Sequence, residues 1–163
     1  MLEFIGNAIW FILPSYMANL APALVKKINF LNYPVDFGKT LYDKRVFGSH
    51  KTLRGLFFGI LGAGLISFIQ SRGFVVGLII GAGTLFGDLV GSFIKRRINL
   101  QPGGKNLIID EIPGSIFAII FAFIFGYLDI NLYQSIFIVI IGLPIHVLAN
   151  ITWHKIGLKE VPW

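Results

Sequence analysis

The chain alternates long apolar runs with short polar stretches, and five apolar runs stand out. They cover roughly residues 2–25, 56–70, 73–94, 112–128 and 132–153. Most of these runs approach the roughly 20 residues that a helix needs to cross the hydrocarbon core of a bilayer, whereas the second run is short. The pattern therefore predicts an all-α, polytopic membrane protein with about five transmembrane helices.

Glycine is frequent in the second and third runs, within FFGILGAGLI and VVGLIIGAGTLFG. Small residues at such spacings let the backbones of two helices approach closely in lipid. We therefore expect tight packing between these helices. The alternative is that the glycines only make the helices flexible.

Basic residues are distributed unevenly between the polar stretches. If five spans alternate across the membrane, only Arg72 of the 14 lysine and arginine residues falls on one side, and the others share the opposite side. The positive-inside rule then places the N-terminus outside, the C-terminus in the cytoplasm and two basic loops in the cytoplasm. These loops are too small to form a separate soluble domain, so residues 1–163 are expected to form a single integral-membrane domain of the cell membrane.

The composition agrees with a membrane location and narrows the chemistry. The chain is 55% hydrophobic and only 13% charged, with a mean hydropathy of +0.77. Absence of cysteine excludes a disulfide framework, a thiolate nucleophile and cysteine-ligated zinc. The net charge of +6 favours an anionic partner, either a lipid headgroup or a nucleotide, and we expect no nucleic acid partner.

Asp88 lies well inside the third apolar run. An ionisable residue at membrane depth is costly and indicates a functional site. Asp88, Ser92 and Lys95 share one helix face because they are separated by four and three residues. This face favours a cation or phosphate site, and the alternative is an internal bond from Asp88 to Ser92 or Lys95 that only satisfies the helix.

Asp110 precedes the fourth apolar run together with Glu111. Acids near a helix N-terminus interact favourably with the helix dipole, which accounts for Glu111 and in part for Asp110. However, Asp88 and Asp110 bracket a loop that contains Lys95 and Arg96. Mg²⁺ takes carboxylate oxygens and leaves room for substrate phosphates, and basic side chains neutralise the remaining phosphate charge. The spacing therefore predicts a magnesium–phosphate site, with a tight turn at QPGGK between its two halves.

The first basic loop contains FGKTLYDKRVFGSHKTLRG, with two Lys-Thr pairs near glycines. Lysine together with backbone and hydroxyl donors is typical of an anion site, and the alternative is nonspecific binding of acidic lipid. The phosphate ligands predicted in this loop are Lys39, His50, Lys51, Thr52 and Arg54.

The stretch GDLVGSFIKRRINLQPGGKNLIIDE resembles the signature region of the CTP-dependent phosphatidate cytidylyltransferases, in which a Ser-x-x-Lys-Arg helix end leads through a Pro-Gly turn to an aspartate. The matching residues are Asp88, Ser92, Lys95, Arg96, Pro102, Gly103 and Asp110. FGSHKTLRG resembles the Lys-Thr-x-x-Gly element of that family, with Lys51, Thr52 and Gly55. Asp110 is followed by Glu111 instead of arginine and the chain is short, features similar to the archaeal branch, the CDP-archaeol synthases.

The resemblance implies transfer of CMP from CTP to a geranylgeranyl ether-lipid phosphate, which yields CDP-archaeol and pyrophosphate. It implies Mg²⁺ on Asp88 and Asp110, with Lys95 as the third catalytic residue. The substrate-binding residues implied are Lys39, His50, Lys51, Thr52, Arg54, Ser92, Lys95 and Arg96. CTP, the lipid phosphate and membrane lipid are the expected partners, and a homo-oligomer is left open. The alternatives are a CTP-dependent polyprenol kinase and a non-enzymatic small transporter or lipid-binding protein.

Overall fold

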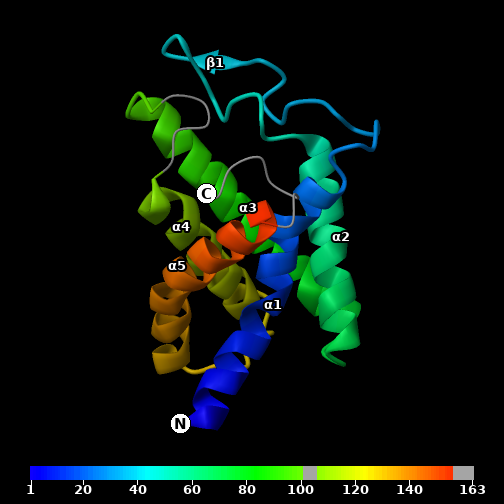
Figure 1. Cartoon of the computed structure of the whole chain (residues 1–163), viewed down its shortest axis with the longest axis vertical. Coiled ribbons are helices and arrows are strands. Elements are labelled where there is room, and N and C mark those ends of the chain that lie inside the picture. Colours follow the sequence, from blue (N-terminus) through cyan, green and yellow to red (C-terminus); the bar gives the residue numbers. More distant parts are fainter. Residues whose placement is uncertain (101–105, 156–163) are drawn as a thin grey trace.

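The computed structural model describes residues 1–100 and 106–155, and five helices form within them. These are α1 (Leu2–Leu24), α2 (Leu53–Ile69), α3 (Phe74–Arg97), α4 (Leu107–Ile124) and α5 (Leu132–Lys155) (Figure 1). The predicted helical fold is confirmed. The QPGGK turn, with Pro102 and Gly103, lies outside the described residues.

The start of the fourth helix differs from its predicted position. Helix α4 begins at Leu107, five residues before the apolar run. The side chain of Asn106 caps it by accepting a hydrogen bond from the N–H of Ile109 at 3.2 Å. Asp110 therefore lies in the first turn of α4 and not before the helix. An acidic side chain is favourable near a helix N-terminus, so the helix can begin before the apolar run does.

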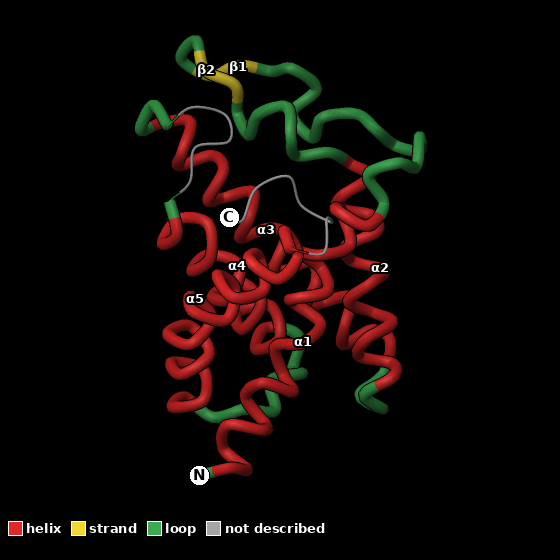
Figure 2. Tube along the Cα trace, viewed as in Figure 1, coloured by secondary structure: helices red, strands yellow, loops and turns green. Residues whose placement is uncertain are grey.

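A short antiparallel pair of strands adds to the helical fold. Strands β1 (Thr40–Leu41) and β2 (Lys44–Arg45) lie in the first basic loop, as Figure 2 shows. The two residues between them, Tyr42 and Asp43, have φ angles of 50° and 59°. Positive φ at both central residues is the requirement of the tightest hairpin turns. The hydrophobic pattern did not predict this hairpin because its strands contain only two residues each.

The helices run up and down, so that chain segments far apart in sequence share one end of the molecule. The loop of residues 25–52, the end of α3 and the start of α4 lie at one end, and the N-terminus lies at the other (Figure 1). Two helices, α1 and α3, are long and apolar enough to cross a membrane, while α2 and residues Leu132–Ile145 of α5 are apolar but shorter. The count of five spans therefore stays a prediction.

Helix α3 packs against α2 and α4 through glycines. A methyl group at Gly77 would overlap the backbone carbonyl of Ala63 in α2, and one at Gly87 would overlap that of Pro113 in α4. Glycine is required at both positions because the two backbones are in direct contact. The predicted tight packing between α2 and α3 is confirmed, and α4 is held against α3 in the same way.

Asp36 organises the first basic loop. Its fully buried side chain accepts hydrogen bonds from the Arg45 guanidinium at 2.5 Å and from the N–H groups of Gly38, Phe47 and Gly48 at 3.0, 3.2 and 2.9 Å. Burial by itself raises the pKa of Asp36, but these four bonds outweigh it and lower the pKa to about 2. The carboxylate is therefore charged, and it holds three points of the loop together.

The hairpin is attached to the end of α3 by Arg97. Its guanidinium donates hydrogen bonds to the carbonyl of Leu41 and to those of Lys44 and Arg45 at 3.2 and 2.9 Å. The same guanidinium lies 5.1 Å from the ring centroid of Phe93, one turn earlier in α3. Arg97 thus satisfies three loop carbonyls and fixes the hairpin over the last turn of the helix.

Replacing Gly87 with alanine tests the contact between α3 and α4. We expect Gly87→Ala to destabilise the protein by about 1–3 kcal/mol, because the added methyl group must push the two backbones apart. Thermal unfolding in detergent measures the change. Gly114→Ala is the matched control in α4, since its nearest neighbour would be 3.6 Å away, and alanine there favours the helix. An equal loss of stability in both variants would contradict the contact.

Asp36 gives the stability of the protein a defined acid dependence. Its pKa is about 2 in the folded protein and 3.8 ordinarily, so the carboxylate stabilises the fold above pH 3.8. This contribution, about 2 kcal/mol, is lost as the pH falls from about 4 towards 2. We expect Asp36→Asn to lower the melting temperature at pH 7 and to weaken its dependence on pH below 4. Asp43 is an exposed acid of the same loop, so Asp43→Asn should leave the melting temperature at pH 7 and its pH dependence unchanged.

Candidate active site

Asp88 lies in α3, and its carboxylate forms an ion pair with the ammonium group of Lys51 from the first basic loop. About a quarter of each side chain is exposed. The expected alternative was a bond within α3, to Ser92 or Lys95. Instead, the cation that meets Asp88 comes from a segment 37 residues away in sequence, so the contact joins the basic loop to the helix.

Asp110 forms a second ion pair across two helices, with Lys95 of α3. The other carboxylate oxygen of Asp110 accepts a hydrogen bond from the N–H of Asn106 at 3.1 Å. Asp110 therefore stabilises the start of α4, as the alternative interpretation expected, and in addition meets a basic residue of the predicted site. Two carboxylates on neighbouring helices are each paired with a lysine.

Lys51 and Thr52 are positioned by the backbone around them. The carbonyl of Lys51 accepts a hydrogen bond from the N–H of Val35 at 2.8 Å. Thr52 is the N-cap of α2, and its hydroxyl oxygen accepts the N–H of Gly55 at 3.2 Å. The hydroxyl hydrogen of Thr52 remains able to donate. The Lys-Thr-x-x-Gly element is thus a helix start that presents Lys51 to α3.

Other predicted phosphate-binding residues have different surroundings. The guanidinium of Arg54, in the first turn of α2, donates to the carbonyl of Ile28 in the loop at 2.5 Å. Lys39 and His50 are exposed, and Lys39 is next to strand β1. On α3, Ser92 is buried, with 4% of its surface exposed, one turn beyond Asp88. The structure therefore joins Lys51 with Asp88 and Lys95 with Asp110.

A cationic cavity of about 290 Å³ lies between the hairpin and the end of α3. Its lining residues are Lys44, Arg45, Gly48, Ser49, Arg96, Asn99 and Leu100. Only Arg96 among them was predicted as a site residue. The adjacent bases Lys44 and Arg45 were visible in the sequence, but their position depends on the hairpin, which was not predicted.

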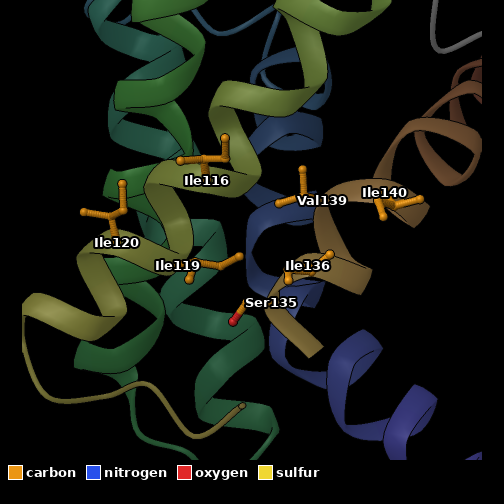
Figure 3. A pocket seen from close by; sticks show the side chains of 7 residues that line it. All are labelled: Ile116, Ile119, Ile120, Ser135, Ile136, Val139 and Ile140. Carbon is orange, nitrogen blue, oxygen red and sulfur yellow. The ribbon is translucent and has the colours of Figure 1, made fainter. Parts of the chain in front are cut away.

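An apolar groove of about 270 Å³ lies between α4 and α5, where side chains of the two helices face each other (Figure 3). It is lined by Ile116, Ile119, Ile120, Ser135, Ile136, Val139 and Ile140. Ile136 is 49% exposed and Ile140 64% exposed, so the groove is open to the surroundings of the protein. A groove of branched aliphatic side chains suits an apolar chain and offers little to a polar ligand.

The two carboxylates determine which metal the site suits. Within the described part of the chain, no three acidic, histidine or cysteine side chains gather as a complete protein metal cage. Mg²⁺ does not need such a cage, because it is commonly held by one or two carboxylates together with water and substrate phosphates. Asp88 and Asp110 supply this type of oxygen ligand, each with about a quarter of its side chain accessible. The residues present therefore fit a hard divalent cation.

The family model and the similar proteins match all or nearly all of this chain. The family model described as CarS-like CDP-archaeol synthase matches residues 1–163. The CDP-archaeol synthase of Methanococcus maripaludis (strain C6) is 36% identical over 187 residues, covering 100% of this chain and 99% of the relative. That of Pyrococcus furiosus is 36% identical over 168 residues, covering 96% and 97%.

A solved structure has the same fold. It was reported as structural insight into an intramembrane enzyme for archaeal membrane lipids biosynthesis. The TM-score is 0.75 with 28% sequence identity, and the match covers 88% of this chain and 92% of the other. The resemblance predicted from the motifs, including its archaeal branch, is confirmed. The chain belongs to the CarS-like CDP-archaeol synthase family.

Proposed function

We propose that this chain transfers CMP from CTP to a geranylgeranyl ether-lipid phosphate, giving CDP-archaeol and pyrophosphate, at the two lysine–carboxylate pairs. Family membership over residues 1–163 makes the protein a nucleotidyltransferase of archaeal lipid synthesis. The observation that carries the assignment of the site is the pairing of Asp88 with Lys51 and of Asp110 with Lys95. These pairs lie where the basic loops meet the apolar helices.

The reaction joins two anions, and the site supplies the opposite charge. An oxygen of the lipid phosphate attacks the α-phosphorus of CTP, and the bond from that phosphorus to the pyrophosphate oxygen breaks. Lys51 and Lys95 donate hydrogen bonds to phosphate oxygens and stabilise the charge that they carry in the transition state. Mg²⁺, held by Asp88 and Asp110, would supply further charge neutralisation. Ser92, one helical turn beyond Asp88, adds a hydroxyl donor.

The resting ion pairs prepare the site for both charged ligands. Each lysine neutralises a carboxylate until the substrate arrives, so the charges of these four groups are compensated in the resting site. When phosphates bind, Lys51 and Lys95 would turn from the carboxylates to phosphate oxygens, and Asp88 and Asp110 would hold the cation, which would supply charge neutralisation. Thr52, Arg54 and Arg96 are proposed to assist at phosphates, with Lys39 and His50 in outer positions of the same basic loop.

The proposed topology has five spans, an outside N-terminus and a cytoplasmic active site within one domain of residues 1–163. The location of both basic segments at one end of the molecule supports it (Figure 1). The likeness to an intramembrane enzyme supports it as well. A cytoplasmic site gives CTP direct access from water, while the lipid reaches the same site from within the bilayer.

The groove between α4 and α5 is proposed to hold an isoprenoid chain of the lipid. Asp110 lies in the first turn of α4, and Ile116 and Ile120 follow it along the same helix, about 9 and 15 Å away along the axis. A lipid whose phosphate reaches Asp110 can therefore extend its chain down α4 into the groove. The branched side chains of the lining fit the methyl branches of such a chain.

Loss of either carboxylate should abolish the reaction. We expect Asp88→Asn and Asp110→Asn each to lower turnover at least 100-fold, because the metal would lose a carboxylate ligand and the phosphates would lose the positive charge of that metal. The assay measures CDP-lipid and pyrophosphate made from CTP, Mg²⁺ and either ether-lipid phosphate or diacyl phosphatidate in detergent. Chelation of Mg²⁺ should stop turnover reversibly.

Asp129→Asn is the matched control for these variants. Asp129 lies in the loop between α4 and α5 and forms an ion pair with Arg72 at 2.8 Å. Neither residue belongs to the two lysine–carboxylate pairs. Full activity of both Asp88→Asn and Asp110→Asn would show that the reaction takes place at a different site of the protein. Formation of lipid phosphate and CDP by the wild-type protein would instead identify a kinase, and ion flux without CTP would identify a transporter.

Filling the groove between α4 and α5 should weaken binding of the lipid phosphate and leave binding of CTP unchanged. We expect Ile136→Trp to raise the KM for the ether-lipid phosphate about tenfold, since the indole occupies space for the chain, with the KM for CTP unchanged. Leu65→Trp is the matched control, because Leu65 is a similarly exposed aliphatic residue of α2, 57% against 49%. Equal kinetics of the two variants would show that the chain binds elsewhere.

A further inference from the structure

The loop between α1 and α2 begins with residues 25–33, the boundary segment, which exposes apolar side chains beside a lysine. Ile28 and Phe30 are exposed, as is Leu24 at the end of α1. Lys27 is exposed next to Ile28. The boundary segment contains no acidic residue, so its net charge is positive. Exposed apolar groups are unfavourable in water, and their combination with a lysine is typical of the boundary between lipid and water.

Hydrogen bonds place the boundary segment at the start of α2. The N–H of Leu53 donates to the carbonyl of Tyr33 at 2.9 Å. The N–H of Arg54 donates to the carbonyl of Leu31 at 2.8 Å. The first N–H groups of a helix have no partner within the helix, so these two bonds complete the start of α2. The boundary segment therefore runs beside the first turn of that helix (Figure 1).

Phe30 extends the apolar surface of α2 towards its polar end. The ring of Phe30 packs edge-to-face against those of Phe57 and Phe58, with centroid distances of 5.9 and 6.5 Å. Phe57 lies in the second turn of α2 and is itself exposed. The apolar surface of α2, which is proposed to meet lipid, therefore continues onto the boundary segment and ends beside Lys27.

We propose that the boundary segment is a docking surface for anionic lipid headgroups of the cytoplasmic leaflet. Ile28 and Phe30 contact the first carbons of the lipid chains, and the ammonium group of Lys27 meets the headgroup phosphate. A lipid fits this surface because its apolar chain and its charge lie next to each other, as the apolar side chains and the lysine do. A soluble anion would leave Ile28 and Phe30 exposed to water, and a lipid without net charge would gain less from Lys27.

The inference rests on the proposed membrane topology and not on the proposed reaction. None of the residues of the boundary segment belongs to the two lysine–carboxylate pairs. The lipid at this surface is a component of the surrounding membrane and is not consumed. Docking can therefore be measured without CTP and without turnover.

A label at a single introduced cysteine tests the position of the boundary segment, since the chain has no cysteine of its own. The full chain with a nitroxide at Ile28→Cys is reconstituted in vesicles of phosphatidylcholine and phosphatidylglycerol. We expect oxygen dissolved in the bilayer to reach this label better than a water-soluble nickel chelate does. Tyr42→Cys, at an exposed residue of the hairpin turn, is the matched control and should show the opposite preference. Equal access of the nickel chelate to both labels would overturn the inference.

The charge of Lys27 should determine the preference for anionic lipid. The signal of the label at Ile28→Cys is followed while phosphatidylglycerol replaces phosphatidylcholine. We expect Lys27→Gln to raise the phosphatidylglycerol fraction needed for half of the change about fivefold, the contribution of one lysine near an anionic surface. Lys27→Arg should keep the original value, as should Lys39→Gln, which removes another exposed lysine of the loop. An unchanged fraction in Lys27→Gln would overturn the inference.

A further variant separates the docking surface from the reaction site, where a lipid phosphate is also proposed to bind. Lys95→Gln removes a lysine of that site and should leave the response of the label to phosphatidylglycerol unchanged. A response that is lost in Lys95→Gln but kept in Lys27→Gln would show that the lipid acts from the reaction site, and it would overturn the docking surface. The expected responses in a protein that makes no CDP-lipid would uphold the docking surface and reject only the transfer reaction.

Discussion

The backbone contact between α3 and α4 determines where one of the two lysine–carboxylate pairs of this protein lies. Gly87 lies against Pro113 and Gly91 against Ile109, which fixes the register of two antiparallel helices. Asp110 follows Ile109 and Lys95 lies one turn beyond Gly91, so the same register brings these two side chains together. In lipid, such a contact depends on close van der Waals packing. A side chain at these glycines would separate the helices and lengthen the ion pair.

A buried carboxylate performs the corresponding task for the loop. Burying a charge is costly unless it is paired and hydrogen-bonded, and Asp36 meets both conditions through Arg45 and three backbone N–H groups. The loop is thereby given one conformation although it has almost no regular secondary structure. The N–H of Val35 donates a hydrogen bond to the carbonyl of Lys51 near the end of the loop. This bond helps to position Lys51 for its ion pair with Asp88. Helix packing positions one lysine–carboxylate pair, and loop folding positions the other.

The sequence predicted those features that depend on local pattern. Long apolar runs predicted the helices. The prediction that Asp88, Asp110 and Lys51 belong to one site stays a prediction, because the structure pairs Lys51 with Asp88 and Lys95 with Asp110. Contacts between residues far apart in the sequence were not predictable in this way. Spacing along α3 favoured a cation or phosphate site at Asp88, with an internal bond to Ser92 or Lys95 as the alternative. The observed ion-pair partners are selected by the register of α4 and by the loop. The sequence analysis did not single out Asp36, because nothing local reveals that the backbone will fold around it.

The proposed reaction follows from how the two ion pairs respond to charged ligands. CTP alone would draw the lysines from the carboxylates and leave those carboxylates facing a polyanion. A divalent cation alone would displace the lysines without offering them another anion. If both bound together, Lys51 and Lys95 would contact phosphate oxygens, and Asp88 and Asp110 would hold the cation, which would supply charge neutralisation, so that each ligand would favour binding of the other. Because unbalanced charge is costly at a membrane boundary, the two ion pairs would favour joint binding of nucleotide and cation over binding of either one alone, if the proposed function holds.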